Sequence, residues 1–309
     1  MSAAVILVAL GIDLALGDPP NRWHPVAWAG SAIAHGSRRV PAGRPALLLA
    51  WGGVLVVGVA LLAALAAAAA VWAAGAAQAG GAWPVFPLVV EAAVLKGAFA
   101  LRGLFAATRG VLAALAADDL PAARARVGRD LVSRPTGDLD AGLVRAAAIE
   151  SLAENLTDSW VAPLCWYAVG GVAGAWAYRV VNTADALVGY RGGRFEYLGK
   201  VAARLDDAMS WIPARLAAAA IVLAAPLAGS ARGAWRALRA DARRPASPNA
   251  GWTMAAMAGA LGVRLEKRGH YRLGEGPAPG AAAGCRALRI AAGAATLTGL
   301  AAVAQASLR

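Results

Sequence analysis

The feature that most constrains the fold is a stretch of more than thirty residues, 46–78, without a single charged side chain. As a helix it would exceed the roughly 30 Å hydrocarbon core of a bilayer, which about 20 residues already span. We therefore expect this helix to tilt, or to extend beyond the core. Since 59% of the 309 residues are hydrophobic and only 16% are charged, the composition is that of an integral membrane protein and not of a soluble domain.

A glycine and proline turn at 80–84 separates this stretch from a second helical pattern, which extends from residue 86 to about residue 115. Together they form the clearest predicted transmembrane hairpin, 46–115. A last apolar helix is predicted at 287–308. The apolar N-terminus lacks a basic segment and a small-residue cleavage site, so we expect a retained helix and not a signal peptide.

The distribution of lysine and arginine predicts the orientation in the membrane. Neither residue type occurs between 79 and 95, whereas every other segment between predicted helices has at least four. By the positive-inside rule, the turn at 80–84 should lie outside the cell and the basic segments in the cytoplasm.

Two apolar segments, 160–178 and 216–230, are flanked by basic loops on both sides, so a single span would place one flank on the wrong face. We expect re-entrant or broken helices there, with bends at the glycine-rich residues 170–174 and at Pro226. The predicted fold is all-α: a polytopic integral membrane protein with re-entrant or broken helices and cytoplasmic helical segments, in a single domain over 1–309.

A row of acidic residues is the strongest indication of a functional site. Glu150, Glu154 and Asp158 recur every four residues, so a helix would align their carboxylates along one stripe. Like charges at this spacing repel by roughly 0.2–0.5 kcal/mol per pair, so we expect a cation beside them, either Mg²⁺ or arginines. Asn155 adds a neutral oxygen ligand. A solvated helix face is the alternative explanation.

Further charged residues are expected in a cytoplasmic cavity walled by the central stretch, 149–215. Carboxylates for Mg²⁺ beside arginines for phosphate are what phosphoryl transfer requires, because the charge on the moving group must be neutralised. The candidate catalytic residues are Glu150, Glu154, Asp158, Asp206 and Asp207, of which the first three are candidate Mg²⁺ ligands. The candidate residues for binding substrate or phosphate are Arg22, His24, Lys96, Arg102, Arg134, Asn155, Arg179, Asn182, Asp185, Tyr190, Arg204 and Arg215.

Some of these residues have structural explanations as alternatives. The segment with Glu91, Lys96 and Arg102 could contain an internal structural ion pair, and His24 could be a hydrogen-bonded loop residue. Asp13 is costly in an apolar segment and is therefore a functional candidate.

Other site types find no support in the sequence. The phosphate-binding patterns GxxxxGK[ST] and GxGxxG are absent, as are a Ser-His-Asp triad and a paired cysteine motif. The net charge of +12 suits anionic lipids and phosphate-bearing ligands, although a preference for arginine codons would explain it equally well. Nucleic acid is not expected as a partner.

Several long segments resemble the signature blocks of the CobD/CbiB family, the adenosylcobinamide-phosphate synthases of cobalamin biosynthesis. They are ESLAENLTDSWVAPLCWYAVGG, GAWAYRVVNTADALVGYR, GKVAARLDDAMSWIPARL, DLALGDPPNRWHPVAWAG, VLKGAFALRGL and SPNAGWTMAAMAGALGVRLEKRGHYRLGEG. The blocks follow the family order and cover nearly the whole chain. Two positions depart from the pattern: Pro135 stands where an acid is expected, and Ser210 where asparagine is expected.

The resemblance implies an ATP- and Mg²⁺-dependent amide ligase of the cell inner membrane, a multi-pass protein with its active site facing the cytoplasm. Its substrates would be a corrinoid, adenosylcobyric acid, and (R)-1-aminopropan-2-yl phosphate or aminopropanol. Membrane lipid and other cobalamin-pathway enzymes would be its partners. Two alternatives stay open: a non-catalytic corrinoid carrier or scaffold, and a transporter with broken helices, which would predict an inverted repeat.

Overall fold

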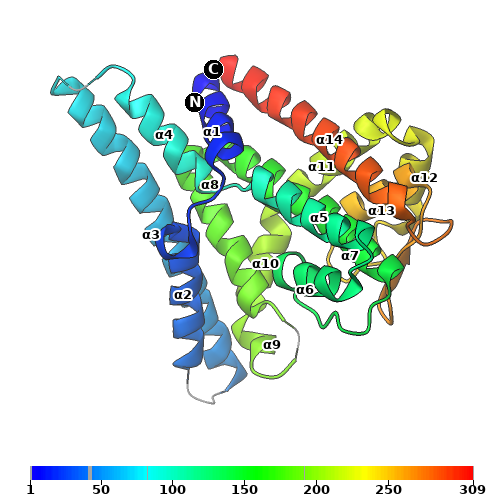
Figure 1. Cartoon of the computed structure of the whole chain (residues 1–309). Coiled ribbons are helices and arrows are strands. Elements are labelled where there is room, and N and C mark those ends of the chain that lie inside the picture. Colours follow the sequence, from blue (N-terminus) through cyan, green and yellow to red (C-terminus); the bar gives the residue numbers. More distant parts are fainter. Residues whose placement is uncertain (1, 41–43, 82, 191, 309) are drawn as a thin grey trace. The chain divides into compact units, whose positions relative to one another are not determined.

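The computed structural model describes residues 2–40, 44–81, 83–190 and 192–308 (Figure 1). The elements are α1 (Ala3–Leu16), η1 (Asn21–Trp23), α2 (Pro25–Arg38), α3 (Pro45–Ala79), α4 (Phe86–Lys96), α5 (Leu101–Ala116), α6 (Leu120–Asp130), α7 (Ala141–Leu156), η2 (Thr157–Val161), α8 (Ala162–Val188), α9 (Phe195–Leu198), α10 (Lys200–Met209), α11 (Trp211–Ala224), η3 (Ala225–Leu227), α12 (Ala231–Asp241), α13 (Ala250–Leu261), β1 (Leu265–Lys267), β2 (Tyr271–Leu273) and α14 (Ala281–Ser307). The regular structure is therefore helical, as predicted, apart from one short two-stranded hairpin.

The chain divides into two compact units. Unit 1 comprises Met1–Ala100, Ala162–Ser210 and Ala301–Arg309, and unit 2 comprises Leu101–Val161 and Trp211–Leu300. A single domain over the whole chain stays a prediction.

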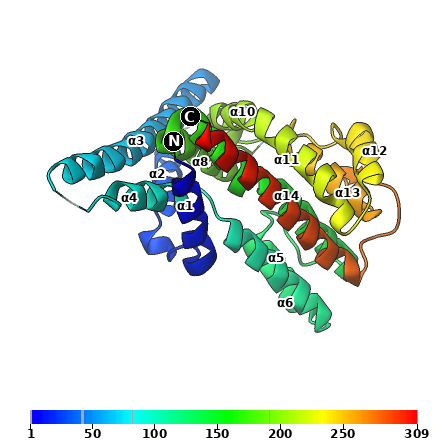
Figure 2. The same ribbon diagram turned by 90° about the horizontal axis from the view of Figure 1, so that it is seen from above.

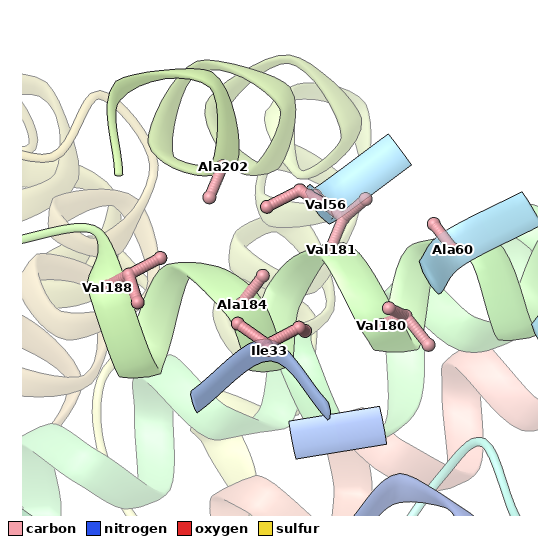
Figure 3. Packing of buried hydrophobic residues seen from close by; sticks show 8 residues of the cluster. All are labelled: Ile33, Val56, Ala60, Val180, Val181, Ala184, Val188 and Ala202. Atoms are coloured by element: carbon pink, nitrogen blue, oxygen red, sulfur yellow. The ribbon is translucent and has the colours of Figure 1, made fainter. Parts of the chain in front are cut away.

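In unit 1, α3 packs against α8 and α4, and α1 packs against α4. Figures 1 and 2 both show α4 beside α1 and α3. Apolar side chains from four helices meet around α8 (Figure 3). The members of this cluster are Ile33, Val56, Ala60, Val180, Val181, Ala184, Val188 and Ala202.

In unit 2, α7 is the central helix and packs against α5, α6, α13 and β1. The two strands form an antiparallel hairpin with Leu265 opposite Leu273. Helices α12 and α13 approach each other closely, because Gly233 of α12 meets Gly259 of α13 where side chains would collide with backbone. A core of α5, α6 and α7 completes the unit, and its buried members are Val111, Ala114, Ala123, Val127, Leu139, Val144, Ala147 and Ala148.

Two helices within the described residues are long and apolar enough to cross a membrane, α3 and α14. The pair Phe195–Met209 and Trp211–Leu227 would make a third only if counted together across its break. These helices support membrane association, whereas the polytopic topology and the re-entrant segments stay predictions.

The second helix of the expected hairpin differs from the sequence pattern. In place of one helix over 86–115, α4 ends at Lys96 and α5 begins at Leu101. A side chain at Gly97 would collide with the ring of Trp176, whose indole N–H donates to the Val94 carbonyl at 2.9 Å. The helix therefore ends where α8 packs against it.

The break expected within the central stretch lies at Gly170 and Gly171. Gly171 has φ 59°, and the backbone of both residues is non-helical inside α8. Pro226 lies in the short 3-10 helix η3, which ends α11. Both expected bends thus coincide with interruptions of the helical backbone.

Candidate active site

Glu150 is positioned by α7, a largely buried helix of unit 2. Asp140 caps α7 by accepting the N–H of Leu143 at 2.9 Å, and most residues from Val144 to Leu156 are buried. Glu150 itself is only 4% exposed. For this carboxylate, the alternative of a solvated helix face is therefore wrong.

The acidic row does not continue as a regular stripe. After Leu156 the α-helix changes to the π-helical turn η2, so Asp158 follows a wider winding than the spacing of four assumes. Glu154 and Asp158 are half-buried. Among the residues that the structure describes, no three His, Cys, Asp or Glu side chains are grouped so that they could hold a metal ion. Mg²⁺ often takes only one or two protein carboxylates together with phosphate oxygens of a substrate, and the donors at this site fit that mode.

The Glu150 carboxylate has partners on one side only. Its Oε2 accepts the Tyr271 hydroxyl at 3.4 Å and lies 3.6 Å from Arg134 Nη2. Its Oε1 is buried and has no hydrogen-bond partner among the described residues. Burial raises the pKa of Glu150 to about 7, although Arg134 and Tyr271 oppose this shift. A buried carboxylate with an unused oxygen is costly for a purely structural residue and indicates a binding or catalytic role.

Tyr271 is the partner that sequence reasoning missed. It lies in β2, and the pKa of its hydroxyl is raised by burial and by the negative charges of Glu150 and Glu154. Tyr271 is therefore within electrostatic reach of two members of the acidic row. In the sequence, the one indication of this tyrosine is its place in HYRLGEG, within a block that resembles a signature of the CobD/CbiB family.

Asn155 has part of its hydrogen-bonding capacity satisfied within α7. Its amide Nδ2 donates to the Ser151 carbonyl at 3.0 Å, while the Ser151 hydroxyl donates to the Leu131 carbonyl at 2.9 Å. Arg102, also in unit 2, is exposed on α5.

The second acidic cluster belongs to unit 1. Asn182 of α8 donates to Asp206 of α10 at 3.1 Å. Asp207 lines a separate cavity of about 350 Å³ together with Tyr190 and Arg204. The structure thus pairs Asn182 with Asp206 and groups the other three residues at a neighbouring hollow. The remaining candidates of this region, Arg179 and Asp185, lie on α8.

Lys96 is the centre of a third charged group, also in unit 1. Its ammonium lies 3.0 Å from Asp13 Oδ1, contacts Asp18 Oδ1 and donates to the Phe99 carbonyl at 3.2 Å. Lys96 is thus held in an internal ion pair, as the structural alternative proposed, but its partners are Asp13 and Asp18 and not Glu91. Glu91 instead accepts the hydroxyl of Tyr167 at 2.7 Å.

Asp18 and His24 complete this group. His24 Nδ1 accepts the N–H of Val26 at 3.2 Å, and its Nε2 lies 3.7 Å from Asp18 Oδ1. Burial opposes ionisation of Asp18, but the neighbouring His24 ring and Lys96 ammonium outweigh it and lower its pKa to about 2. The sequence indicated only a helix-breaking turn at this aspartate.

An apolar cavity of about 1010 Å³ opens beside this charged group. Its walls come from α1, α2, α3 and α4, with Asp18, His24 and Lys96 at its polar end. Arg22 lies nearby in sequence, with its guanidinium 6.0 Å from the ring centroid of Trp23. Arg215, the last candidate, lines a pocket of unit 2 together with Trp211 and Trp252.

These features are those of a helical protein with a buried carboxylate site and with two helices apolar enough to cross a membrane. A family model described as CobD/CbiB protein matches residues 6–296. The chain belongs to this family.

Three relatives illustrate the similarity. The cobalamin biosynthesis protein CobD of Dehalococcoides mccartyi is 42% identical over 272 residues, which cover 88% of this chain and 86% of that protein. The probable cobalamin biosynthesis protein CobD of Methanothermobacter thermautotrophicus is 38% identical over 278 residues, with shares of 88% and 86%. The CobD protein of Rhodobacter capsulatus is 38% identical over 276 residues, with shares of 85% and 81%. No solved structure matches the chain.

Proposed function

We propose that this protein acts in cobalamin biosynthesis as an ATP-dependent amide ligase. It would join adenosylcobyric acid to (R)-1-aminopropan-2-yl phosphate, or to aminopropanol, and give adenosylcobinamide phosphate, or adenosylcobinamide from aminopropanol. Family membership and the names of the relatives support the pathway. The observation that carries the chemistry is the buried Glu150 carboxylate, with one oxygen unused and Arg134 and Tyr271 beside the other.

Amide formation needs an activated acid, because a carboxylate does not condense with an amine at neutral pH. The corrinoid carboxylate would attack the γ-phosphorus of ATP, which gives an acyl phosphate and releases ADP. The amine nitrogen would then attack the acyl carbon, the bond from that carbon to the phosphate oxygen would break, and inorganic phosphate would leave. The proton of the attacking amine must pass to a base.

The residues around Glu150 have properties that suit these steps. Glu150 would take the amine proton on its free Oε1, and Tyr271 would fix the orientation of the carboxylate. Arg134 would neutralise charge on the transferred phosphoryl group. Mg²⁺, when bound with ATP, would supply further charge neutralisation, and Glu154 and Asp158 offer the oxygen ligands that it prefers.

The polar residues of unit 1 are proposed to bind substrate. Asn182 and Asp206 present an amide and a carboxylate, which suit the amide-rich rim of a corrinoid. We further propose a multi-pass location in the cell inner membrane with the active site toward the cytoplasm, supported by the two apolar helices α3 and α14.

The alternative is a corrinoid carrier or scaffold without catalytic activity. The apolar cavity of about 1010 Å³ in unit 1 favours it, because a volume of this size suits a large ligand. A carrier would bind adenosylcobyric acid and would neither consume ATP nor form an amide.

Glu150→Gln separates these possibilities. Membranes with the unchanged protein, given ATP, Mg²⁺, adenosylcobyric acid and aminopropanol phosphate, should release ADP and amide in equal amounts. The variant should lose at least about 100-fold of this rate, the scale of one strong transition-state interaction. Its melting temperature in detergent should be equal or higher, because an incompletely paired buried charge is removed.

Asp130→Asn is the matched control, since Asp130 is a carboxylate of the same unit in a surface pair with Arg129. It should keep the wild-type rate and melting temperature. Folded wild-type protein that binds adenosylcobyric acid without forming amide would favour the carrier. A Glu150→Gln variant that melts earlier but keeps its rate per folded molecule would show that Glu150 is structural.

A further inference from the structure

A pocket of unit 2 is built around a guanidinium that lies against two indoles. Trp211 and Arg215 lie four residues apart on α11, and Trp252 lies on α13. The Arg215 guanidinium carbon is 4.2 Å from the ring centroid of Trp211 and 4.5 Å from that of Trp252. Two aromatic rings therefore lie within cation–π distance of this guanidinium and restrict its orientation.

Hydrogen bonds fix one edge of the same guanidinium. Arg215 Nη1 donates to the Trp211 carbonyl at 2.7 Å and to Asn249 Oδ1 at 2.8 Å. Asn249 is buried, and its own N–H donates to the Ser247 hydroxyl at 3.2 Å. Among the residues that the structure describes, Nη2 makes only a long contact, to the Pro248 carbonyl at 3.4 Å. Arg215 is thus held in place with donors to spare.

The positive charge of this pocket is not balanced by a carboxylate of any described residue. Arg243 lines the same cavity of about 610 Å³, so two arginines contribute positive charge to this pocket. Within the described part of the chain, neither arginine pairs with an acid. The nearby Asp241 instead accepts from Arg244, at 3.0 Å, and from the Gly274 N–H, at 2.7 Å.

The pocket also offers a hydroxyl donor. Ser247 lines the cavity and accepts the N–H groups of Asn249 and Ala250, each at 3.2 Å. Because both of these contacts use its oxygen, its hydroxyl proton is available to a ligand. Two arginines, a hydroxyl and two indole walls are complementary to an anion with three or more acceptor oxygens on an organic carrier.

We propose that the pocket formed by Trp211, Arg215, Arg243, Ser247 and Trp252 binds the phosphate group of an organic phosphate. Arg215 is the fixed recognition residue, because the two rings and the hydrogen bonds of one edge restrict its orientation before a ligand arrives. Arg243 is exposed and adds the second charge. The phosphate could belong to a soluble ester or to a phospholipid headgroup, and both would use the same donors. The proposal does not depend on the ligase reaction, since it concerns binding alone.

Binding by the full-length protein in an uncharged detergent tests this site. The soluble probes are ATP and aminopropanol phosphate, titrated by calorimetry at low and at raised salt. The lipid probe is a nanodisc with phosphatidylglycerol, compared with one of phosphatidylcholine alone. Arg243→Gln should weaken binding of the true ligand class by about 10-fold, the effect of one charge-assisted contact, and should reduce its salt dependence.

Arg236→Gln is the matched control, because Arg236 is an exposed arginine of α12 in the same unit and its loss changes the net charge equally. It should leave all affinities unchanged. Arg215→Lys keeps the charge but loses the planar fork, so it should also weaken binding. If that variant is unstable, Arg243→Gln still decides.

The pattern of losses identifies the ligand. A loss for ATP or aminopropanol phosphate alone supports a soluble phosphate ester, and a loss for phosphatidylglycerol nanodiscs alone supports a lipid headgroup. Equal affinities of wild type, Arg243→Gln and Arg236→Gln for every probe would overturn the site. Binding that depends on Arg243 in a protein that forms no amide would keep the site and reject the proposed ligase.

Discussion

At the scale of single residues, Lys96 shows how this protein tolerates a charge in an apolar environment. The side chain is almost fully buried, and two carboxylates, Asp13 and Asp18, lie against its ammonium. A buried charge without a partner is strongly unfavourable, so each carboxylate lowers the free energy of the folded state. The His24 ring also lies beside Asp18, with its Nε2 3.7 Å from Asp18 Oδ1.

This arrangement predicts a specific loss of stability in acid. The folded-state pKa of Asp18, about 2, lies below its ordinary value of 3.8. Asp18 therefore stabilises the folded protein above about pH 4, and this contribution is lost as the pH falls from about 4 to about 2. The lowering corresponds to at most about 2 kcal/mol. The Asp18→Asn variant should lack this stabilisation at pH 7, and its free energy of unfolding should depend less on pH between 4 and 2.

Denaturant unfolding in detergent at a series of pH values measures the effect. Asp138→Asn serves as the control, because Asp138 is exposed and its loss should leave the pH dependence unchanged. Parallel stability curves for wild type and Asp18→Asn between pH 4 and pH 2 would contradict the prediction.

At the scale of elements, the packing of α3 against α9 depends on a glycine, Gly52, at their contact. A methyl group at Gly52 would overlap the carbonyl oxygen of Leu198, at the contact between α3 and α9. Gly52→Ala should force these elements apart and lower the free energy of unfolding by about 1–3 kcal/mol, the usual cost of overpacking. The melting temperature in detergent should fall accordingly.

Gly58 of the same helix provides the comparison, since a methyl group there would meet nothing within 4 Å. Gly58→Ala should leave stability unchanged or raise it by up to about 1 kcal/mol, because alanine favours a helix. If both variants melted at the same temperature, the close contact with Leu198 would not contribute to stability.

The elements also show which parts of the fold a sequence can predict. The charge-free run 46–78 became α3 almost residue for residue, because apolarity over that length leaves few alternatives. The break between α4 and α5 was not predictable from the same property. Apolar residues continue across it, and the cause is Trp176, which comes from a distant segment.

The candidate site follows the same rule. The four-residue spacing of Glu150, Glu154 and Asp158 was enough to single out Glu150, because these residues are close together in the sequence. Its partner Tyr271 lies 121 residues further along the chain, and only tertiary structure brings the two together. The π-helical turn after Leu156 was equally hidden, since no local pattern announced the change of winding.

At the scale of the whole molecule, the distribution of basic residues leads to a prediction about topology. The turn after α3 has no lysine or arginine between residues 79 and 95, whereas the loops around residues 137 and 193 are rich in arginine. Positive segments are retained in the cytoplasm. Each loop should therefore be accessible to a label from one side of the membrane only.

Single cysteines test this topology in intact cells. The two native cysteines, Cys165 and Cys285, are free and are first replaced by serine. Gly80→Cys should then react with a membrane-impermeant maleimide added outside, whereas Gly137→Cys and Gly193→Cys should react only after permeabilisation. Gly137 precedes α7 and Gly193 follows α8. If neither cysteine reacts with the label from outside, the chain between them enters and leaves the membrane on the cytoplasmic side. Labelling of Gly193→Cys from outside would make residues 160–178 an ordinary span and would reject the re-entrant arrangement at Gly170 and Gly171.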